Sequence, residues 1–196
     1  MKRKYREEDI CRKLIDSTIK VIAEEGLDKA TTRSICSLTG TNEAYIYRYY
    51  KDKEDLFAKT FADLDEELLV VAMQNFPLLT DTSSDRMTRA RMFYCSIWRF
   101  LLGNQKKCLA YLRYYYSPYF LHYSAEEQLR RYAHFINRLK PFFLEEADVR
   151  MIFNYILNTM LNFAKKVFDG EVPDDEDTEE HVFRLIFLAV QQYFKP

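Results

Sequence analysis

The chain has 196 residues, and its 29 lysines and arginines nearly balance 30 aspartates and glutamates, which gives a formal net charge of −1. With 48% hydrophobic residues, 4 glycines and 5 prolines, the composition excludes fibrous, low-complexity and disordered classes. A chain of this size buries roughly 70% of its extended surface on folding, enough for one large core or two small ones. Because alternating β-branched runs are few, the sequence predicts a mostly helical protein.

Targeting segments are not expected in this sequence. No apolar stretch follows the basic residues at its start, and no window offers about 18 uncharged apolar residues, so we expect neither a signal peptide nor a membrane span. The four cysteines have no Cys-x-x-Cys spacing: Cys11, Cys36, Cys95 and Cys108. We therefore expect free, mostly buried thiols in a cytoplasmic protein that has no membrane partner.

The first helix is predicted from about residue 7 to residue 25, where Gly26 can end it. Its apolar side chains share one helical face: Ile10, Leu14, Val21 and Ile22. Thr31 is then placed to cap a helix over residues 32–39, and Asn42 to cap a third helix through about residue 50. Two short helices joined by a turn of about three residues have the dimensions of a helix-turn-helix.

An ordered pattern of residues runs through this region and into a fourth helix, which Asp52 is placed to cap. It comprises two apolar pairs separated by small residues, a glycine, a Thr-Thr pair, a Gly-containing turn, an aromatic helix and a Lys-Glu-x-Leu start. The residues are Leu14, Ile15, Ser17, Thr18, Val21, Ile22, Gly26, Thr31, Thr32, Thr39, Gly40, Thr41, Asn42, Ile46, Tyr47, Arg48, Tyr49, Tyr50, Lys53, Glu54, Asp55 and Leu56. With this pattern, residues 10–60 resemble the DNA-binding domain of the TetR family of transcriptional regulators.

This resemblance implies an all-α fold with two domains. A three-helix helix-turn-helix domain for DNA binding would occupy residues 1–52. A larger helical bundle of about nine helices for effector binding and dimerisation would follow over residues 53–196. The turn departs from the usual Ala-Gly-Val-Ser, which leaves the preferred operator sequence open.

The third helix offers the clearest candidates for reading DNA. Ile46 and Tyr50 are four residues apart and should pack inward, while Arg48 is placed for a guanine or a phosphate. By resemblance, Tyr47 and Lys53 would hold phosphates, and the start of the second helix would touch the backbone or a base. The alternative for the tyrosines is that they only fill a small core. The predicted DNA-binding residues are Thr32, Arg33, Asn42, Glu43, Tyr45, Tyr47, Arg48, Tyr49 and Lys53.

The middle of the chain is unusually aromatic. Residues 92–143 contain 15 of the 31 aromatic residues, and the resemblance places an effector pocket in this region. Because buried tyrosine hydroxyls need partners, the surplus of tyrosine predicts a cavity with hydroxyls pointing inward. The segment has few acidic residues, so we expect a small apolar or aromatic effector rather than a strongly charged one. A solid aromatic core is the alternative. The predicted ligand-binding residues are Phe93, Trp98, Tyr111, Tyr115, Tyr119 and Phe135.

Two later segments, residues 149–168 and 182–194, are apolar around nearly their whole circumference. A helix without a polar face must be covered on every side, so a second copy of the chain is expected to cover part of them. By resemblance, these two helices would form a dimerising four-helix bundle. The predicted homodimer interface comprises Ile152, Ile156, Met160, Phe183, Ile186 and Val190.

Catalytic, metal and cofactor sites find no support in the sequence. His122, His134 and His181 lack metal-ligand spacing, and the acidic run over residues 174–177 is typical of a solvated loop. No phosphate loop or nucleophile motif is present. The sequence therefore predicts a dimeric, cytoplasmic DNA-binding regulator, most simply a repressor released by an effector, and not an enzyme. The alternatives are a DNA-binding regulator without an effector and a helical interaction protein.

Overall fold

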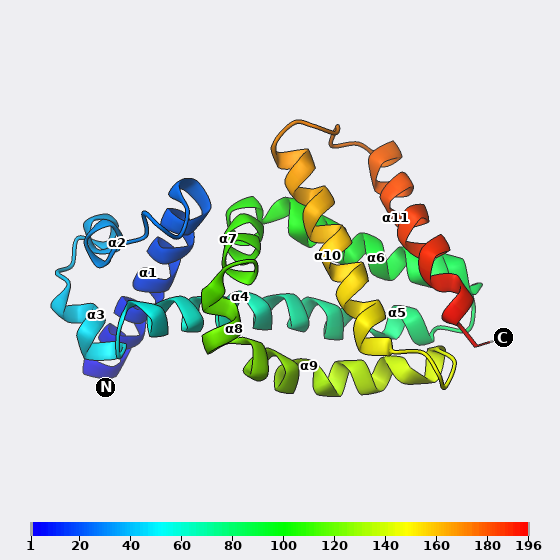
Figure 1. Ribbon diagram of the computed structural model, residues 1–196, viewed down its shortest axis with the longest axis horizontal. Helices are drawn as coiled ribbons and strands as arrows, with labels where there is room; N and C mark the ends of the chain where they lie inside the picture. Colours follow the sequence, from blue (N-terminus) through cyan, green and yellow to red (C-terminus); the bar gives the residue numbers. More distant parts are fainter. Residues whose placement is uncertain (1, 196) are drawn as a thin grey trace. The chain divides into compact units, whose positions relative to one another are not determined.

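The computed structural model describes the backbone of residues 2–195 and the side chains of residues 7–195. In this part of the chain the regular structure is helical, with one isolated bridge between Phe143 and Phe194 (Figure 1). The predicted all-α class is confirmed. None of the helices among these residues is both long enough and apolar enough to cross a membrane.

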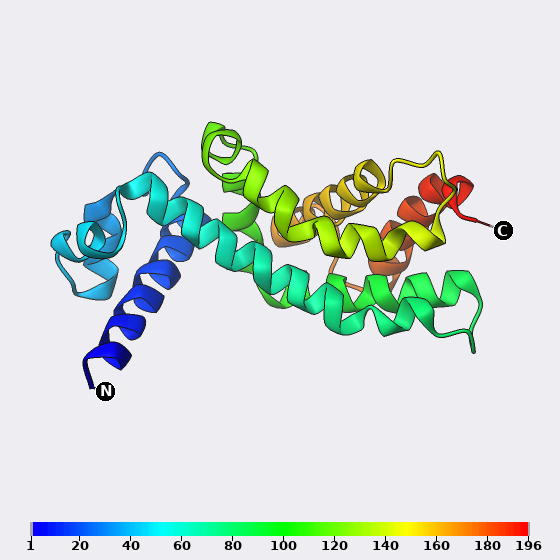
Figure 2. The same ribbon diagram turned by 90° about the horizontal axis from the view of Figure 1, so that it is seen from below.

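Eleven α-helices follow one another along these residues (Figures 1 and 2). They are α1 (Lys2–Glu25), α2 (Thr32–Thr39), α3 (Ala44–Tyr49), α4 (Lys53–Asn75), α5 (Pro77–Thr80), α6 (Arg86–Gly103), α7 (Gln105–Tyr115), α8 (Pro118–Tyr123), α9 (Ala125–Leu139), α10 (Val149–Phe168) and α11 (Glu176–Val190). Two short 3₁₀ segments, Lys140–Phe142 and Gln191–Tyr193, follow α9 and α11.

The chain divides into two compact units. The N-terminal unit comprises Met1–Glu66 and Leu109–Gln128, and the C-terminal unit comprises Glu67–Cys108 and Leu129–Pro196. Helix α4 begins in the first unit and ends in the second. The boundary predicted between residues 52 and 53 therefore lies at the start of a helix and not between the two units.

The helix-turn-helix follows the predicted caps closely. The Thr31 hydroxyl accepts the backbone N–H of Ser34 at 3.0 Å, and the Ser34 hydroxyl in turn accepts the Thr31 N–H at 2.9 Å. This reciprocal pair satisfies amide groups that have no partner inside α2. Gly40 ends the helix with a φ of 67°, a left-handed conformation that suits glycine. Asp52 accepts the N–H of Asp55 at 2.8 Å and so caps α4 as predicted.

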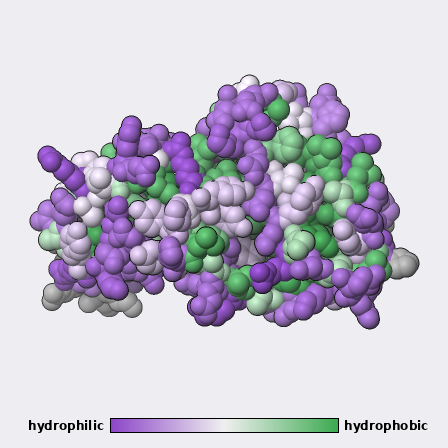
Figure 3. All heavy atoms as spheres, in the orientation of Figure 1, coloured by the Kyte–Doolittle hydropathy of each residue, from purple (hydrophilic) through white to green (hydrophobic). Residues whose placement is uncertain are grey.

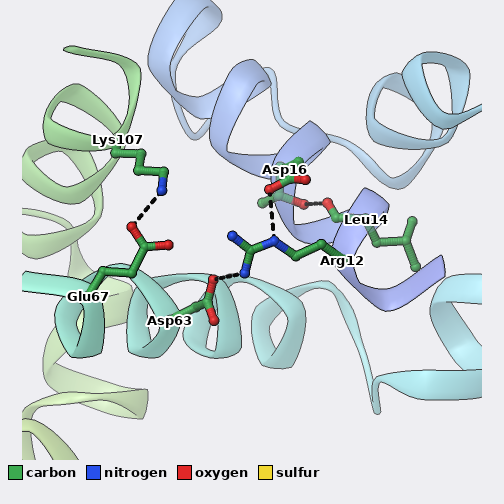
Figure 4. Close-up of polar contacts among 7 residues, drawn as sticks. Arg12, Leu14, Asp16, Asp63, Glu67 and Lys107 are labelled. Carbon is green, nitrogen blue, oxygen red and sulfur yellow. Dashed lines mark hydrogen bonds and ion pairs between the residues drawn. The ribbon is translucent and has the colours of Figure 1, made fainter. Parts of the chain in front are cut away.

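Helix α1 is longer than predicted, because it begins at Lys2 and no helix-breaking residue precedes residue 7. Its face with Leu14 and Ile22 is buried. On the outer side, Arg12 donates to Asp63 of α4 at 3.0 Å and pairs with Asp16 at 3.4 Å (Figure 4). Figure 4 also shows an ion pair inside the C-terminal unit, between Lys107 and Glu67.

The N-terminal unit has an aromatic core built around Phe61, which is 1% exposed. Its ring lies 4.8 Å from that of Tyr111, 4.9 Å from that of Tyr114 and 5.4 Å from that of Phe120. The Tyr111 hydroxyl donates to the buried carboxylate of Asp65 at 3.0 Å. This tyrosine hydroxyl therefore finds its partner within the protein, as buried polar groups generally do.

The C-terminal unit contains the two long apolar segments. Helix α10 has the predicted bounds of residues 149–168, whereas α11 spans Glu176–Val190 instead of residues 182–194. The earlier start follows from Asp175, whose carboxylate accepts the N–H of Thr178 at 2.8 Å and caps the helix. Helices α10 and α11 lie side by side, and both pack against α6.

All four cysteines are free, as predicted, and three are buried. Burial raises the pKa of the Cys108 thiol to about 12. Burial together with the carboxylate of Glu179 raises the pKa of Cys95 to about 11, and that carboxylate accepts the Cys95 thiol at 2.8 Å. Both thiols are therefore protonated at neutral pH and poor nucleophiles.

Candidate DNA interface and ligand cavity

Helix α3 separates its side chains into a buried and an exposed set. Ile46 is fully buried and Tyr50 is 7% exposed, as their spacing predicts. Tyr47 is 60% exposed, Arg48 is also exposed, and Tyr49 is half-buried. The tyrosine at position 50 therefore fills the core, while those at positions 47 and 49 remain accessible to a partner.

The start of α2 and the turn before α3 present a polar surface. Arg33, Asn42 and Glu43 are exposed, while Thr32 and Tyr45 are half-buried. The Thr32 hydroxyl donates to the Glu43 carboxylate and links the two helices of the motif. Asn42 accepts the N–H of Ala44 at 3.0 Å, so it supports the turn, while the capping position is Glu43 and α3 begins one residue later than predicted.

Two of the cationic side chains predicted to contact DNA, Arg48 and Lys53, form weak ion pairs within the protein. Arg48 lies 3.3 Å from a carboxylate oxygen of Glu7, with its guanidinium 5.5 Å from the centre of the Tyr49 ring. Lys53 lies 3.8 Å from a carboxylate oxygen of Glu54. Because an exposed pair contributes only about 0–1 kcal/mol, a phosphate or a guanine can displace Glu7 from Arg48 at little cost. The Lys53 pair is half-buried but long.

Residues 14–60 match the family model described as "Bacterial regulatory proteins, tetR family". Residues 14–60 form a TetR-family DNA-binding domain. Among curated relatives, the HTH-type transcriptional regulator BetI of Klebsiella pneumoniae is 32% identical over 79 residues. That match covers 40% of each chain, so this chain aligns with less than half the length of that relative.

The fold of the whole chain is that of TetR-family structures. A TetR family transcription regulator from Marinobacter aquaeolei superposes with a TM-score of 0.76 at 16% identity, covering 96% of this chain and 98% of that one. A second, described as a putative TetR family transcription regulator from Shewanella, superposes with a TM-score of 0.72 at 14% identity, covering 91% and 96%. At these identities the likeness establishes the fold.

The C-terminal unit of this TetR-family fold encloses a cavity of about 330 Å³. Its walls come from the end of α4 and from α5, α6, α9, α10 and α11, together with the segments that follow α9 and α11. Most of the lining is aliphatic or aromatic, and no aspartate or glutamate among the residues with described side chains belongs to it. A cavity of this size and character can hold a small organic molecule.

Two of the six predicted ligand-binding residues, Phe93 and Phe135, line this cavity. Trp98 does not; it is 2% exposed and its ring lies 5.8 Å from that of Tyr94. The remaining three, Tyr111, Tyr115 and Tyr119, belong to the N-terminal unit and lie outside the cavity.

The prediction failed for these tyrosines because they pack on the aromatic side chains of α4 and α8. Tyr115 lies 4.5 Å from Phe120, and Tyr119 meets Phe57 edge-on at 5.9 Å between ring centroids. The excess of tyrosine therefore reflects two different environments, a core in one unit and a cavity in the other. Aromatic density along the sequence does not distinguish between them.

The prediction of the dimer interface also fails for most of its residues. All six line the cavity, and five are buried within the C-terminal unit: Ile152, Met160, Phe183, Ile186 and Val190. Ile156, the sixth, is half-buried. The five buried residues face their own unit, so their assignment to a subunit interface is wrong, whereas that of the half-buried Ile156 stays a prediction.

A different stripe of α10 and α11 is exposed and apolar. Met151 is 68% exposed and Tyr155 44%, and on α11 Leu185 is 57% exposed and Leu188 60%. Figure 3 shows hydrophobic side chains gathered over these two helices. On α10 each exposed residue directly precedes a predicted interface residue: Met151 precedes Ile152, and Tyr155 precedes Ile156. One residue corresponds to about 100° of rotation around the helix. Because α10 is apolar around nearly its whole circumference, the sequence does not show which of the two stripes is exposed.

Sequence reasoning also missed most of the cavity wall. The polar members of the wall are Arg86, Arg89, Lys195, Tyr94 and Tyr132. The first two stand in the opening turns of α6, just after its capping residue Asp85. Their spacing of three residues on one helix face is a signal that the sequence contains, although only the fold shows that the face borders a cavity.

Proposed function

We propose that this protein is a cytoplasmic, homodimeric transcriptional regulator that binds operator DNA through α2 and α3. It acts by binding and not by catalysis, and it releases its operator when a small molecule occupies the cavity of the C-terminal unit. Repression relieved by an effector is the simplest form of such regulation.

The exposed surface of the TetR-family domain carries the DNA-binding part of this proposal. Tyr47, Arg48 and Arg33 project from α2 and α3 and are free of the core. A single helix fits the major groove, where arginine can pair with guanine and tyrosine can contact phosphates. In a symmetric dimer, two such helices would meet half-sites about 34–36 Å apart.

An unsatisfied hydroxyl in the cavity wall supports the effector part. Tyr94 is 5% exposed, and its hydroxyl is a buried side-chain oxygen with no hydrogen-bond partner in the described part of the chain. Leaving such a group unpaired costs about 1–3 kcal/mol, which a ligand acceptor could recover. If the ligand lowers the affinity of the protein for DNA by some factor, then DNA must lower its affinity for the ligand by the same factor.

Two alternative functions predict different DNA-binding behaviour. A DNA-binding regulator without an effector would bind its operator equally well in the presence of any small molecule. A helical interaction protein would bind no specific DNA, and the exposed Arg48 and Tyr47 argue against it. A gel-shift titration with DNA from upstream of the protein's own gene separates these cases: specific retardation is expected, and its absence would contradict the proposal.

The exposed stripe of α10 and α11 supports the homodimer. An apolar face of this kind marks an interaction site on a protein that is otherwise rich in surface charge. We expect Leu185→Asp combined with Leu188→Asp to give a folded monomer, because the charges would be desolvated in the interface but remain in water on the free subunit. Sedimentation velocity measures the change, with the parent protein as the dimeric reference.

The matched control places a charge on the side of α11 that faces the cavity. Ile186 is 4% exposed and lines the cavity, so Ile186→Asp should unfold the C-terminal unit instead of releasing intact monomers. A parent protein that sediments as a monomer at micromolar concentration would contradict the dimer.

A further inference from the structure

The cavity of the C-terminal unit has an unequal distribution of charge. Its three charged lining residues, Arg86, Arg89 and Lys195, are all cationic. Arg89 is half-buried, whereas Arg86 and Lys195 are exposed at the margin of the cavity. The rest of the wall is apolar apart from two tyrosine hydroxyls, so a ligand would meet positive charge and almost no other polarity.

The two arginines lie together at one end of the cavity. Both belong to the first turns of α6, and the Arg86 guanidinium lies 5.6 Å from the centre of the Phe194 ring. Phe194 contacts Phe143 at 5.1 Å between ring centroids, and Phe143 belongs to the same apolar cluster as Val149 at the start of α10. The starts of α6 and α10 therefore share this end.

The cavity extends away from this end along both helices. On α6 its lining runs from Arg86 to Ile97, and on α10 from Val149 to Met160. Each interval is eleven residues, which corresponds to roughly 16 Å of helix at about 1.5 Å per residue. The space is therefore elongated, with cations at one end and hydrocarbon walls along its length.

None of the three cationic side chains forms an ion pair within the described part of the chain. Arg89 makes only a long hydrogen bond, at 3.5 Å, to the carbonyl oxygen of Leu79. The hydrogen bonds of the neighbouring carboxylates go elsewhere: Asp85 accepts the N–H groups of Met87 and Thr88, and Asp81 accepts that of Ser83. Besides its hydrogen bonds with Ser83, the Asp81 carboxylate also feels the charge of Arg89, which helps to lower its pKa, but the Asp81 and Arg89 side chains form no ion pair. Neither carboxylate lines the cavity.

We propose that the ligand of this cavity is a long-chain aliphatic carboxylate, whose head pairs with Arg86 and Arg89 while its tail lies along α6 and α10. This inference rests on the proposed function, because it names the chemical class of the proposed effector. Arginine is suited to the head because its planar guanidinium can donate two parallel hydrogen bonds to a carboxylate. This ligand differs from the effector without strong charge that the sequence predicts.

Three twelve-carbon probes with different heads test the proposal by isothermal titration calorimetry on the full-length protein: dodecanoate, dodecanol and dodecyltrimethylammonium, each kept below the concentration at which it forms micelles. We expect dodecanoate to bind about tenfold or more tightly than dodecanol, since a hydrogen bond to a charged group is worth about that factor. The cationic probe should bind most weakly, because it would face like charges.

The double variant Arg86→Gln/Arg89→Gln should lose this preference for dodecanoate while binding dodecanol as the parent does. Arg86→Lys/Arg89→Lys should keep part of the preference, because it retains the charge without the planar geometry. Arg150→Gln is the matched control, since Arg150 is an exposed arginine of α10 that does not line the cavity, and it should behave as the parent.

The outcomes separate this inference from the proposed function. Equal binding of dodecanol and dodecanoate, or parental dodecanoate binding by the glutamine variant, would overturn the carboxylate while leaving an effector cavity in place. Binding of none of the three probes, with operator binding intact, would overturn the carboxylate and remove the support for an apolar effector. Loss of operator binding in the parent protein would instead contradict the DNA-binding function, whatever the probes do.

Discussion

Replacement of Arg48 by alanine is expected to weaken operator binding by about 1–3 kcal/mol and to change the preferred DNA sequence. Arg48 is exposed on α3 and held only by its pair with Glu7 and the ring of Tyr49, so its guanidinium is free to meet a base edge in the major groove. Fluorescence anisotropy with the operator and with single-base variants of it measures both effects. Unchanged affinity and preference in a folded Arg48→Ala protein would show that α3 does not read the groove through this residue.

Lys53→Ala provides the contrasting variant. Lys53 stands at the first residue of α4, where a phosphate would meet both its charge and the start of the helix. Its loss should weaken binding to all DNA sequences similarly and lower the salt dependence by about one released counterion. A change in sequence preference for Lys53→Ala, or none for Arg48→Ala, would reverse the roles assigned to the two residues.

The largest expected effect on stability comes from Phe61→Ala in the N-terminal unit. Phe61 is 1% exposed and its ring contacts those of Tyr111, Tyr114 and Phe120. Truncation would leave a void among rigid rings, which should lower the free energy of unfolding by about 3–5 kcal/mol. Urea unfolding followed by circular dichroism measures the loss.

Leu121→Ala is the control for this experiment. Leu121 belongs to the same unit but is 75% exposed, so its truncation should change the free energy of unfolding by less than about 0.5 kcal/mol. A small effect of Phe61→Ala would mean that Tyr111 and its neighbours do not form a tightly packed core. The reassignment of these tyrosines from cavity to core would then fail.

Local features of the fold could be predicted because they depend on neighbouring residues. The caps at Thr31, Gly40 and Asp52 and the inward side chains of α3 follow from spacings of three or four residues, and the structure has them where expected. The bounds of α10 follow from an uninterrupted apolar run. The DNA-binding candidates also come from local spacing, since they all lie within one short, ordered motif, and their contacts with DNA stay a prediction.

The cavity wall and the exposed stripe could not be predicted, because both depend on packing between distant segments. Tyr111 and Phe135 are equally aromatic in the sequence, yet one meets Phe61 and Asp65 while the other borders the cavity. Similarly, Ile152 and Met151 are neighbours on an apolar helix, and only the fold shows which of them faces inward. The positive end of the cavity is formed by α6 and the end of the chain, which lie about a hundred residues apart.

Specific binding of a dimer to DNA is tested most directly by hydroxyl-radical footprinting on the upstream region of the protein's own gene. We predict two protected half-sites related by two-fold symmetry, with centres one helical turn or a multiple of it apart, near 34–36 Å in the simplest case. At the lowest concentration at which the parent protects fully, Arg48→Ala should protect both half-sites only partly or not at all. Protection without two-fold symmetry, or a footprint that Arg48→Ala leaves intact, would contradict the proposed mode of binding.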